Sequence, residues 1–256
     1  MFINTTGLVL RETAYKDASK ILTVLTGTEG KLTVSAHGAL RRNSKMASAT
    51  QLLVFSEMTL SSNRDRWTLT EARSVEQFIG LRSDVVLLAL GSYFAELIEA
   101  VADEDSPSME LLPLCLNALF ALSEGIKAPE YVKPVFELRL MAASGFAPIL
   151  AHCSICGRES MERAYLDLEG GTIRCDGCTP VGGGARGVGA MLSAGAISAA
   201  RHAVGCDSKK LFSFTLGDAA LREIYAAAER YLLAQLDRGF RTLDYYKKLI
   251  AADRWT

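Results

Sequence analysis

Two cysteine pairs in the second half of the chain constrain its fold more than any other feature. The pairs are Cys153-Ser-Ile-Cys156 and Cys175-Asp-Gly-Cys178, and eighteen residues separate them. Each Cys-x-x-Cys pair forms a tight turn that presents two thiolates to one ion, and this separation is typical of a four-cysteine zinc site. Four thiolates complete a tetrahedron and leave no position for substrate or water. We therefore expect one structural zinc ion per chain.

Other interpretations of the cysteines have less support. Two disulfides would indicate a secreted chain, but Met1-Phe-Ile-Asn-Thr-Thr6 has neither the basic start nor the apolar run of a signal peptide, so we expect a cytoplasmic protein. A thioredoxin-like redox site uses one pair in a βαβ unit. A nucleobase deaminase needs a His-x-Glu, and no histidine here has glutamate two residues on. A degenerate site without metal is the remaining alternative.

The first 80 residues have the pattern of a small β-barrel. Runs of β-branched and apolar residues alternate with turn sequences such as Gly27-Thr-Glu-Gly30 and Ser61-Ser-Asn-Arg-Asp65. Five short antiparallel strands suit a closed barrel, either an OB-fold, which binds oligonucleotides on one face, or an SH3-like barrel. The expected strands are residues 7–10, 20–26, 31–36, 51–60 and 66–72.

Residues 81–256 have helical periodicity, and the zinc insert interrupts them at 150–182. The predicted fold class is thus α+β: an N-terminal five-stranded OB-fold barrel (1–80) followed by an all-α domain (81–256) with a four-cysteine zinc-finger insert. Apolar runs are well short of the ~20 residues that span a bilayer, so no membrane association is expected. The expected helices are residues 83–102, 108–123, 129–145, 190–204, 218–237 and 243–251.

Charge is unevenly distributed along the chain. Residues 1–80 hold ten Lys/Arg and seven Asp/Glu, whereas residues 81–256 hold eighteen and twenty-two. No acidic residue lies between Glu29 and Glu57, and the segment Gly38-Ala-Leu-Arg-Arg-Asn-Ser-Lys-Met-Ala-Ser48 is basic, small and rich in hydroxyls. Such a loop can follow a phosphate backbone. A solvated surface loop would explain the same charges. The candidate phosphate contacts are Lys31, Arg41, Arg42, Lys45, Arg64 and Arg66, the last two assigned from the barrel pattern.

The sequence contains no motif that indicates catalysis. The chain has no Gly-x-x-x-x-Gly-Lys-Ser/Thr phosphate loop, no Gly-x-Ser-x-Gly elbow, and only three isolated histidines. The segment Gly182-Gly-Gly-Ala-Arg-Gly187 matches a dinucleotide-binding motif by letter, but it follows a cysteine turn with no βαβ unit, so we interpret it as a flexible connector. We therefore expect a protein that is not an enzyme.

Several segments, taken in order, resemble one known family. Ile21-Leu-Thr-Val-Leu-Thr-Gly-Thr-Glu-Gly-Lys31 and Ala36-His-Gly-Ala-Leu-Arg-Arg-Asn-Ser-Lys45 are similar to a strand-turn and a basic loop of the RecO family of bacterial recombination mediators. Phe136-Glu-Leu-Arg-Leu140, Gly145-Phe-Ala-Pro148 and Cys153-Ser-Ile-Cys-Gly157 are similar to the helix that leads into its first cysteine pair. The resemblance covers residues 6 to about 240.

This resemblance implies a non-enzymatic role in DNA repair and recombination. Proteins of this family bind single- and double-stranded DNA, anneal complementary strands, engage RecR and the C-terminal tail of the single-stranded-DNA-binding protein, and help load RecA. The implied location is the bacterial cytoplasm, at the nucleoid. Two other classes remain open: a zinc-ribbon adaptor whose SH3-like or OB barrel binds RNA or protein, and an enzyme whose site the sequence does not reveal.

Overall fold

The computed structural model describes residues 1–63, 66–104, 106–107, 109–179 and 188–253. The chain divides into two compact units, Met1–Glu124 with Phe240–Thr256, and Gly125–Gly239. The first unit extends past residue 80 because one helix packs on the first barrel strand, and two further helices and the C-terminal helix pack on that helix. Within the described ranges, no helix has both the length and the apolar content needed to cross a membrane.

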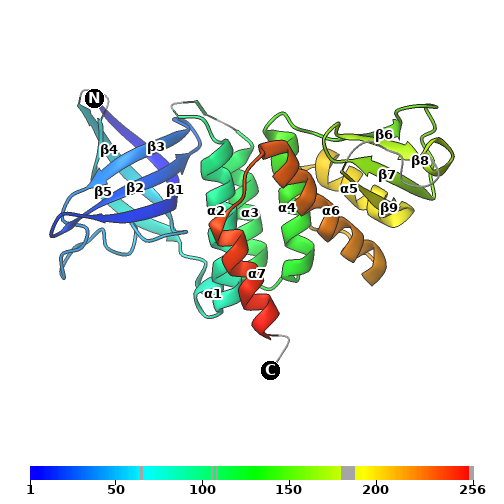
Figure 1. Ribbon diagram of the computed structural model, residues 1–256. Coiled ribbons are helices and arrows are strands. Elements are labelled where there is room, and N and C mark those ends of the chain that lie inside the picture. The colour runs from blue at the N-terminus through cyan, green and yellow to red at the C-terminus, as the bar shows by residue number, and fades with distance from the viewer. Residues whose placement is uncertain (64–65, 105, 108, 180–187, 254–256) are drawn as a thin grey trace. The chain divides into compact units, whose positions relative to one another are not determined.

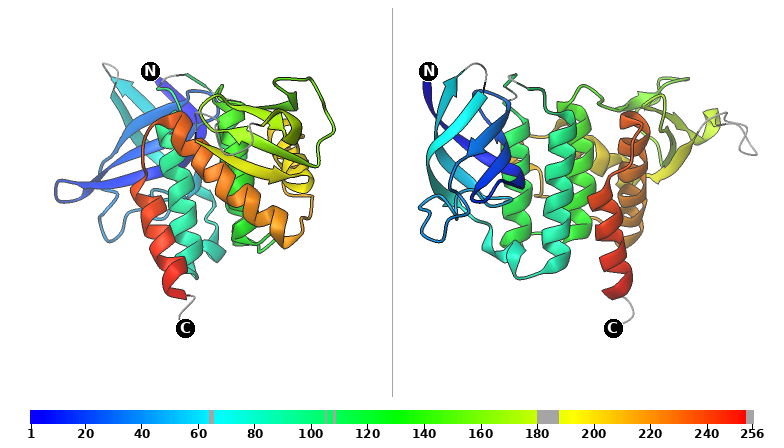
Figure 2. Two further views of the ribbon diagram at one scale, coloured as in Figure 1. Left: turned by 45° about the vertical axis from the view of Figure 1, so that its right-hand side comes forward. Right: turned by 60° about the vertical axis from the view of Figure 1, so that its left-hand side comes forward.

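Five strands form the predicted barrel in the first unit (Figures 1 and 2). They are β1 (Phe2–Tyr15), β2 (Ser19–Thr26), β3 (Lys31–Ala36), β4 (Phe55–Asn63) and β5 (Arg66–Glu76). Their order is β1-β2-β3-β5-β4, and β4 pairs back with β1. The closed OB-like barrel is thus confirmed. The expectation that all strands are antiparallel is wrong at one seam, because β3 and β5 pair in parallel where the barrel closes.

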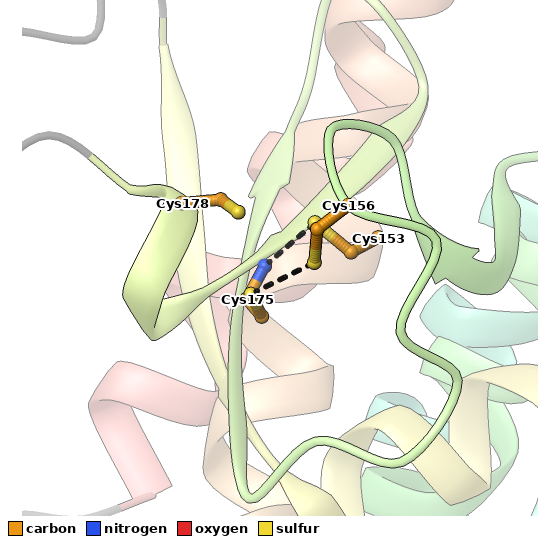
Figure 3. Close-up of side chains that lie close together, drawn as sticks. All are labelled: Cys153, Cys156, Cys175 and Cys178. Carbon is orange, nitrogen blue, oxygen red and sulfur yellow. Dashed lines mark hydrogen bonds between the residues drawn. The ribbon is translucent and has the colours of Figure 1, made fainter.

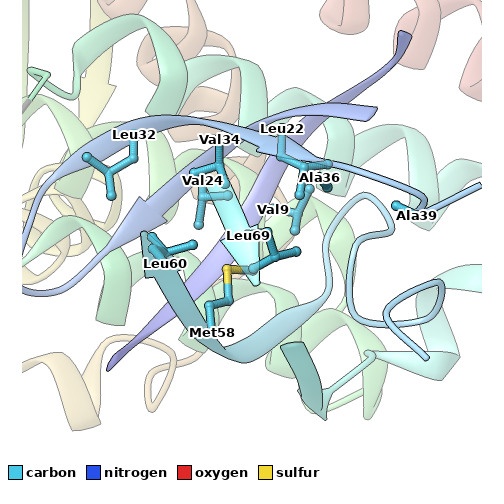
Figure 4. Packing of buried hydrophobic residues seen from close by; sticks show 10 residues of the cluster. All are labelled: Val9, Leu22, Val24, Leu32, Val34, Ala36, Ala39, Met58, Leu60 and Leu69. Atoms are coloured by element: carbon cyan, nitrogen blue, oxygen red, sulfur yellow. The ribbon is translucent and has the colours of Figure 1, made fainter. Parts of the chain in front are cut away.

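The barrel interior is filled by alternate residues of the strands, as period-two burial requires (Figure 4). Val24, Val34 and Leu60 are fully buried there. Residues 51–54, expected in the fourth strand, instead end the preceding loop, since Leu53 has a φ of 60° and its amide donates to the Val9 carbonyl over 2.9 Å. The complete interior cluster comprises Val9, Leu22, Val24, Leu32, Val34, Ala36, Ala39, Met58, Leu60 and Leu69.

The helices of the first unit are α1 (Ile79–Arg82), α2 (Val85–Val101), α3 (Leu111–Ser123) and α7 (Arg241–Asp253). The C-terminal helix α7 lies beside α2, although about 140 residues separate them (Figure 2). The Glu96 carboxylate of α2 accepts hydrogen bonds from the amide and hydroxyl of Thr242, at the start of α7. This contact fixes the end of the chain to the first unit.

The second unit combines helices with a small sheet. Its helices are α4 (Pro129–Ala143), α5 (Ala194–Gly205) and α6 (Asp218–Leu236), with 3-10 turns η1 (Asp176–Cys178) and η2 (Ser208–Lys210). The strands β6 (Ile149–Cys153), β7 (Arg163–Asp167), β8 (Thr172–Cys175) and β9 (Gly189–Ser193) form a sheet in the order β6-β8-β7-β9.

That sheet corrects two expectations. The insert is a four-stranded element that continues to residue 193, beyond the expected end at 182. The helix expected to start at 190 starts at Ala194, because residues 189–193 pair with β7. Gly189 permits this pairing, since a Cβ there would lie 2.0 Å from the Tyr165 ring. The expected connector at 182–187 lies outside the described residues.

Candidate metal centre and nucleic-acid interface

The four cysteines of the two pairs converge in the second unit (Figure 3). Cys153 ends β6, Cys175 ends β8 and Cys178 ends the 3-10 turn that follows. All four sulfur atoms lie within 4.8 Å of one another, and the Cys156 and Cys175 sulfurs are 3.7 Å apart. A zinc ion with Zn–S bonds of about 2.3 Å places its sulfurs ~3.8 Å apart. The described residues therefore provide a four-thiol group of the right size for a tetrahedral metal ion.

Backbone groups support these sulfurs. Gly157, with a φ of 74°, turns the chain after the first pair, and its amide donates to the Cys153 carbonyl over 3.0 Å. Hydrogen bonds from the backbone of Cys156 and Cys175 lower the pKa of the Cys153 thiol to about 6. Hydrogen bonds with the Cys156 and Cys175 thiols raise the pKa of Cys178 to about 12. The lowered pKa of Cys153 favours the thiolate, the form in which cysteine binds metals.

The basic loop, residues 38–48, is held against the β1–β2 hairpin. The Leu40 amide donates to the Ala18 carbonyl over 3.1 Å. Just beyond the loop, the Thr50 carbonyl accepts a 3.3 Å hydrogen bond from the buried Lys20 ammonium of β2. Consecutive turns inside the loop are closed by hydrogen bonds from Arg41 to Gly38 and from Ser44 to Arg41. These contacts give the loop a fixed path over the hairpin.

Three of the predicted phosphate contacts lie on this loop. Arg41, Arg42 and Lys45 are exposed, and none forms an ion pair with another residue in the described part of the chain. An exposed cation without a carboxylate partner can bind phosphate without first breaking an ion pair. These three exposed cations therefore share one loop whose backbone path is fixed.

Two of the other three predicted contacts, Lys31 and Arg66, lie outside this loop. Lys31 is half-buried, and its ammonium donates to the Glu99 carbonyl of α2 over 2.8 Å. Arg66 is exposed at the start of β5 and pairs with Asn63, the last residue of β4. Residues of β4 close to Asn63 pair with the N-terminal end of β1, which is the end away from the β1–β2 hairpin. Arg64 lies outside the described residues.

Sequence reasoning missed one exposed cation near the loop. Lys16 lies in the β1–β2 turn, whose Ala18 accepts the Leu40 amide. Lys16 does not belong to the stretch without acidic residues, because Glu12 and Asp17 are close to it in sequence. A test for lysine in predicted hairpin turns would have found it.

Comparisons with known proteins cover almost the whole chain. A family model described as "Recombination protein O N terminal" matches residues 1–78, and one described as "Recombination protein O C terminal" matches residues 82–244. The chain is 30% identical to a "DNA repair protein RecO" of Acetivibrio thermocellus, with 97% of each chain covered. It is 32% identical to one of Symbiobacterium thermophilum, over 97% of this chain and 98% of the relative. The chain therefore belongs to the RecO family of DNA repair proteins.

Proposed function

We propose that this protein is a non-enzymatic recombination mediator that binds single- and double-stranded DNA and promotes annealing of complementary strands. The observation that carries the proposal is the anchored basic loop, with Arg41, Arg42 and Lys45 exposed and without ion-pair partners among the described residues. Annealing breaks and forms no covalent bond. It requires reversible neutralisation of two polyanions so that they can approach, and exposed cations on a rigid barrel can supply that.

The proposed partners follow from the family. With RecR, the protein would bind the C-terminal tail of the single-stranded-DNA-binding protein and help load RecA onto strands covered by that protein. Lys31 and Arg66 would add positive charge outside the basic loop, and Arg64 is proposed with them from the sequence alone. A pull-down with RecR and an annealing assay on covered strands would test these partners directly.

We further propose that the cysteine group holds one structural zinc ion. Cys153, Cys156, Cys175 and Cys178 would supply four thiolate ligands, which close the coordination sphere and leave no site for chemistry. The ion would tie β6 to β8 and to the turn after β8. Elemental analysis of protein purified without chelator should find one zinc per chain, and a metal-free preparation with the same fold would contradict this assignment.

Salt-dependent DNA binding tests the main proposal. Fluorescence anisotropy would measure the affinity for a labelled single strand and a labelled duplex over a series of salt concentrations. Each phosphate contact contributes a slope of about 0.9 on duplex DNA and about 0.7 on single strands, in log affinity against log salt. The double variant Arg41→Ala, Arg42→Ala should therefore reduce the slope by about 1.8 on the duplex and about 1.4 on the single strand.

A matched control removes the same charge elsewhere. Arg222 and Arg230 are exposed on α6 of the second unit, so Arg222→Ala with Arg230→Ala should leave both slopes unchanged. Equal losses in the two double variants would mean that net charge, and not the basic loop, drives binding. Preference for RNA over DNA of the same sequence in a competition assay would instead favour an RNA-binding adaptor.

A further inference from the structure

The tip of the β1–β2 hairpin carries an exposed aromatic ring. Tyr15 is the last residue of β1, pairs with Ser19 and is 46% exposed. Its hydroxyl makes no hydrogen bond to another residue in the parts of the chain described. The chain turns at Lys16, which has a φ of 54°, and the Lys16 ammonium lies 5.2 Å from the centroid of the Tyr15 ring. The ring thus faces solvent and has a cation at its face.

The same turn supports the basic loop. Leu40 donates its amide to Ala18, two residues after Lys16 in the turn, and Arg41 directly follows Leu40. Backbone contact therefore places the aromatic ring and the loop cations on adjoining segments. This arrangement combines a ring that can stack on a base with cations that can bind the flanking phosphates.

The pairing register continues this surface across the barrel. Tyr15 and Thr13 project from one face of β1, and Thr13 pairs with Ile21, which pairs with Ser35 of β3. Thr33 is exposed two residues before Ser35 on the same face. That face is the outer one on β2 and β3, because Leu22 and Val34, the neighbours of Ile21 and Ser35 in the sequence, point into the barrel. The hydroxyl groups of this surface therefore lie on β1 and β3, with Ile21 of β2 between them.

We propose that Tyr15 binds an unpaired base of single-stranded DNA by stacking. The inference rests on the proposed DNA-binding function and specifies its ligand as an unstacked nucleobase whose phosphates lie on the basic loop. A base paired within a duplex has both of its faces covered by neighbouring base pairs, so the Tyr15 ring cannot stack on it. Tyr15 therefore contributes to the binding of single strands but not of duplexes, which contact the cations alone.

Two substitutions at this position test the proposal in the full-length protein. Tyr15→Ala removes the ring, and we expect it to weaken binding of a single-stranded oligonucleotide about tenfold, which is within the range for one stacked base. Its affinity for a duplex should stay within about twofold. Tyr15→Phe keeps the ring and should bind both as the unmodified protein does. The salt slopes should not change in either variant, because no phosphate contact is removed.

A control and a direct readout complete the experiment. Tyr245 is 52% exposed on α7, so Tyr245→Ala removes an equally accessible ring far along the sequence and should leave single-strand binding unchanged. Ultraviolet crosslinking to an oligonucleotide with one 5-iodouracil, followed by peptide mass spectrometry, should attach the base to the peptide that contains Tyr15.

Each outcome separates this inference from the proposed function. Unchanged single-strand affinity in Tyr15→Ala, or an equal loss on single strands and duplexes, would overturn the stacking role. An equal loss in Tyr245→Ala would do so too. The proposed function would survive those results if the Arg41→Ala, Arg42→Ala variant still lost affinity. It would fail if the unmodified protein bound neither DNA, or if it preferred RNA in the competition assay.

Discussion

Replacing Lys133 with methionine tests how a buried charge cluster stabilises the second unit. The Lys133 ammonium of α4 lies 2.8 Å from the Glu137 carboxylate, 2.8 Å from the Glu229 carboxylate of α6 and 4.5 Å from the centroid of the Tyr225 ring. The side chains of Lys133 and Glu137 are fully buried, and that of Glu229 is 11% exposed. The cluster therefore links α4 to α6 through charges that have been removed from water.

The charge state of this lysine follows from its surroundings. Burial lowers the pKa of Lys133, but attraction and hydrogen bonds to Glu137 and Glu229 together raise the pKa above its usual 10.5. A lysine whose pKa is higher in the folded state than in the unfolded state stabilises the fold, and this contribution is complete at any pH below the unfolded-state pKa. The contribution is lost as the pH rises through the folded-state pKa. At neutral pH the lysine is charged and its contribution is complete.

The substitution leaves two largely buried carboxylates without this cation. Removal of one member of a buried ionic cluster typically costs about 3–5 kcal/mol, because the remaining charge is desolvated without compensation. The deficit should shrink as the pH is lowered, because a protonated carboxyl group carries no charge and needs no cation beside it. Replacing all three ionic residues, by Lys133→Met, Glu137→Leu and Glu229→Leu, should recover most of the lost stability, because apolar side chains need no partner.

Hydrogen exchange measured by mass spectrometry reports this effect locally. A loss of 3 kcal/mol should accelerate exchange of the most protected amides in α4 and α6 by about a hundredfold, while barrel peptides keep their rates. Lys209→Met, at an exposed lysine of the same unit, is the matched control and should change little. Unchanged exchange in α4 and α6, or a triple variant no more stable than the single one, would refute the reasoning.

Two further substitutions test packing and capping in the first unit. A Cβ on Gly80 would lie 2.0 Å from the Ser123 carbonyl oxygen, so Gly80→Ala should separate α1 from α3 and destabilise by about 3 kcal/mol in urea denaturation. Gly205→Ala, where a Cβ meets no atom within 4 Å, should be neutral or stabilising, and equal losses would exclude the clash as the cause. The Asp84 carboxylate accepts hydrogen bonds from the amides of Val86 and Leu87, so Asp84→Ala should cost about 1 kcal/mol. Asp84→Asn should preserve most of that stability, and an equally unstable Asn variant would show that the oxygen acceptor is not the cap.

Local sequence signals predicted the barrel and most helices well. Short runs of β-branched residues bounded by Gly27 and Gly30 located β2 and β3, and the helix expected at 83–102 corresponds to α2 with its Asp84 cap. The sheet of the second unit was missed because its strands are only four or five residues long and two of its three pairings, β6 with β8 and β7 with β9, join segments far apart in the sequence. Residues 189–193 are a strand because β7 lies beside them, a contact that helical periodicity in the sequence does not register.

The environment of each side chain could not be predicted from the sequence, and this limited the prediction of the site. The cysteine spacing correctly indicated a four-thiol group, since two turns of fixed length leave little freedom. The cations were predicted only by their density along the chain, which treats Lys31 and Arg41 alike. Only the fold distinguishes them, because Lys31 meets the end of α2 and Arg41 faces solvent.

The partners of each cation suggest what it does in this protein. Lys133 is enclosed by carboxylates and stabilises the helices, and Arg11 pairs with Glu99 over 2.9 Å on the barrel surface that meets α2. A phosphate would have to displace such a partner, and the lost ion pair would offset part of the energy of binding. Arg41 and Arg42 have no such pair among the described residues, so a phosphate gains their full attraction. The absence of ion pairs at Arg41 and Arg42 among the described residues therefore matters to the proposed function as much as the presence of arginines.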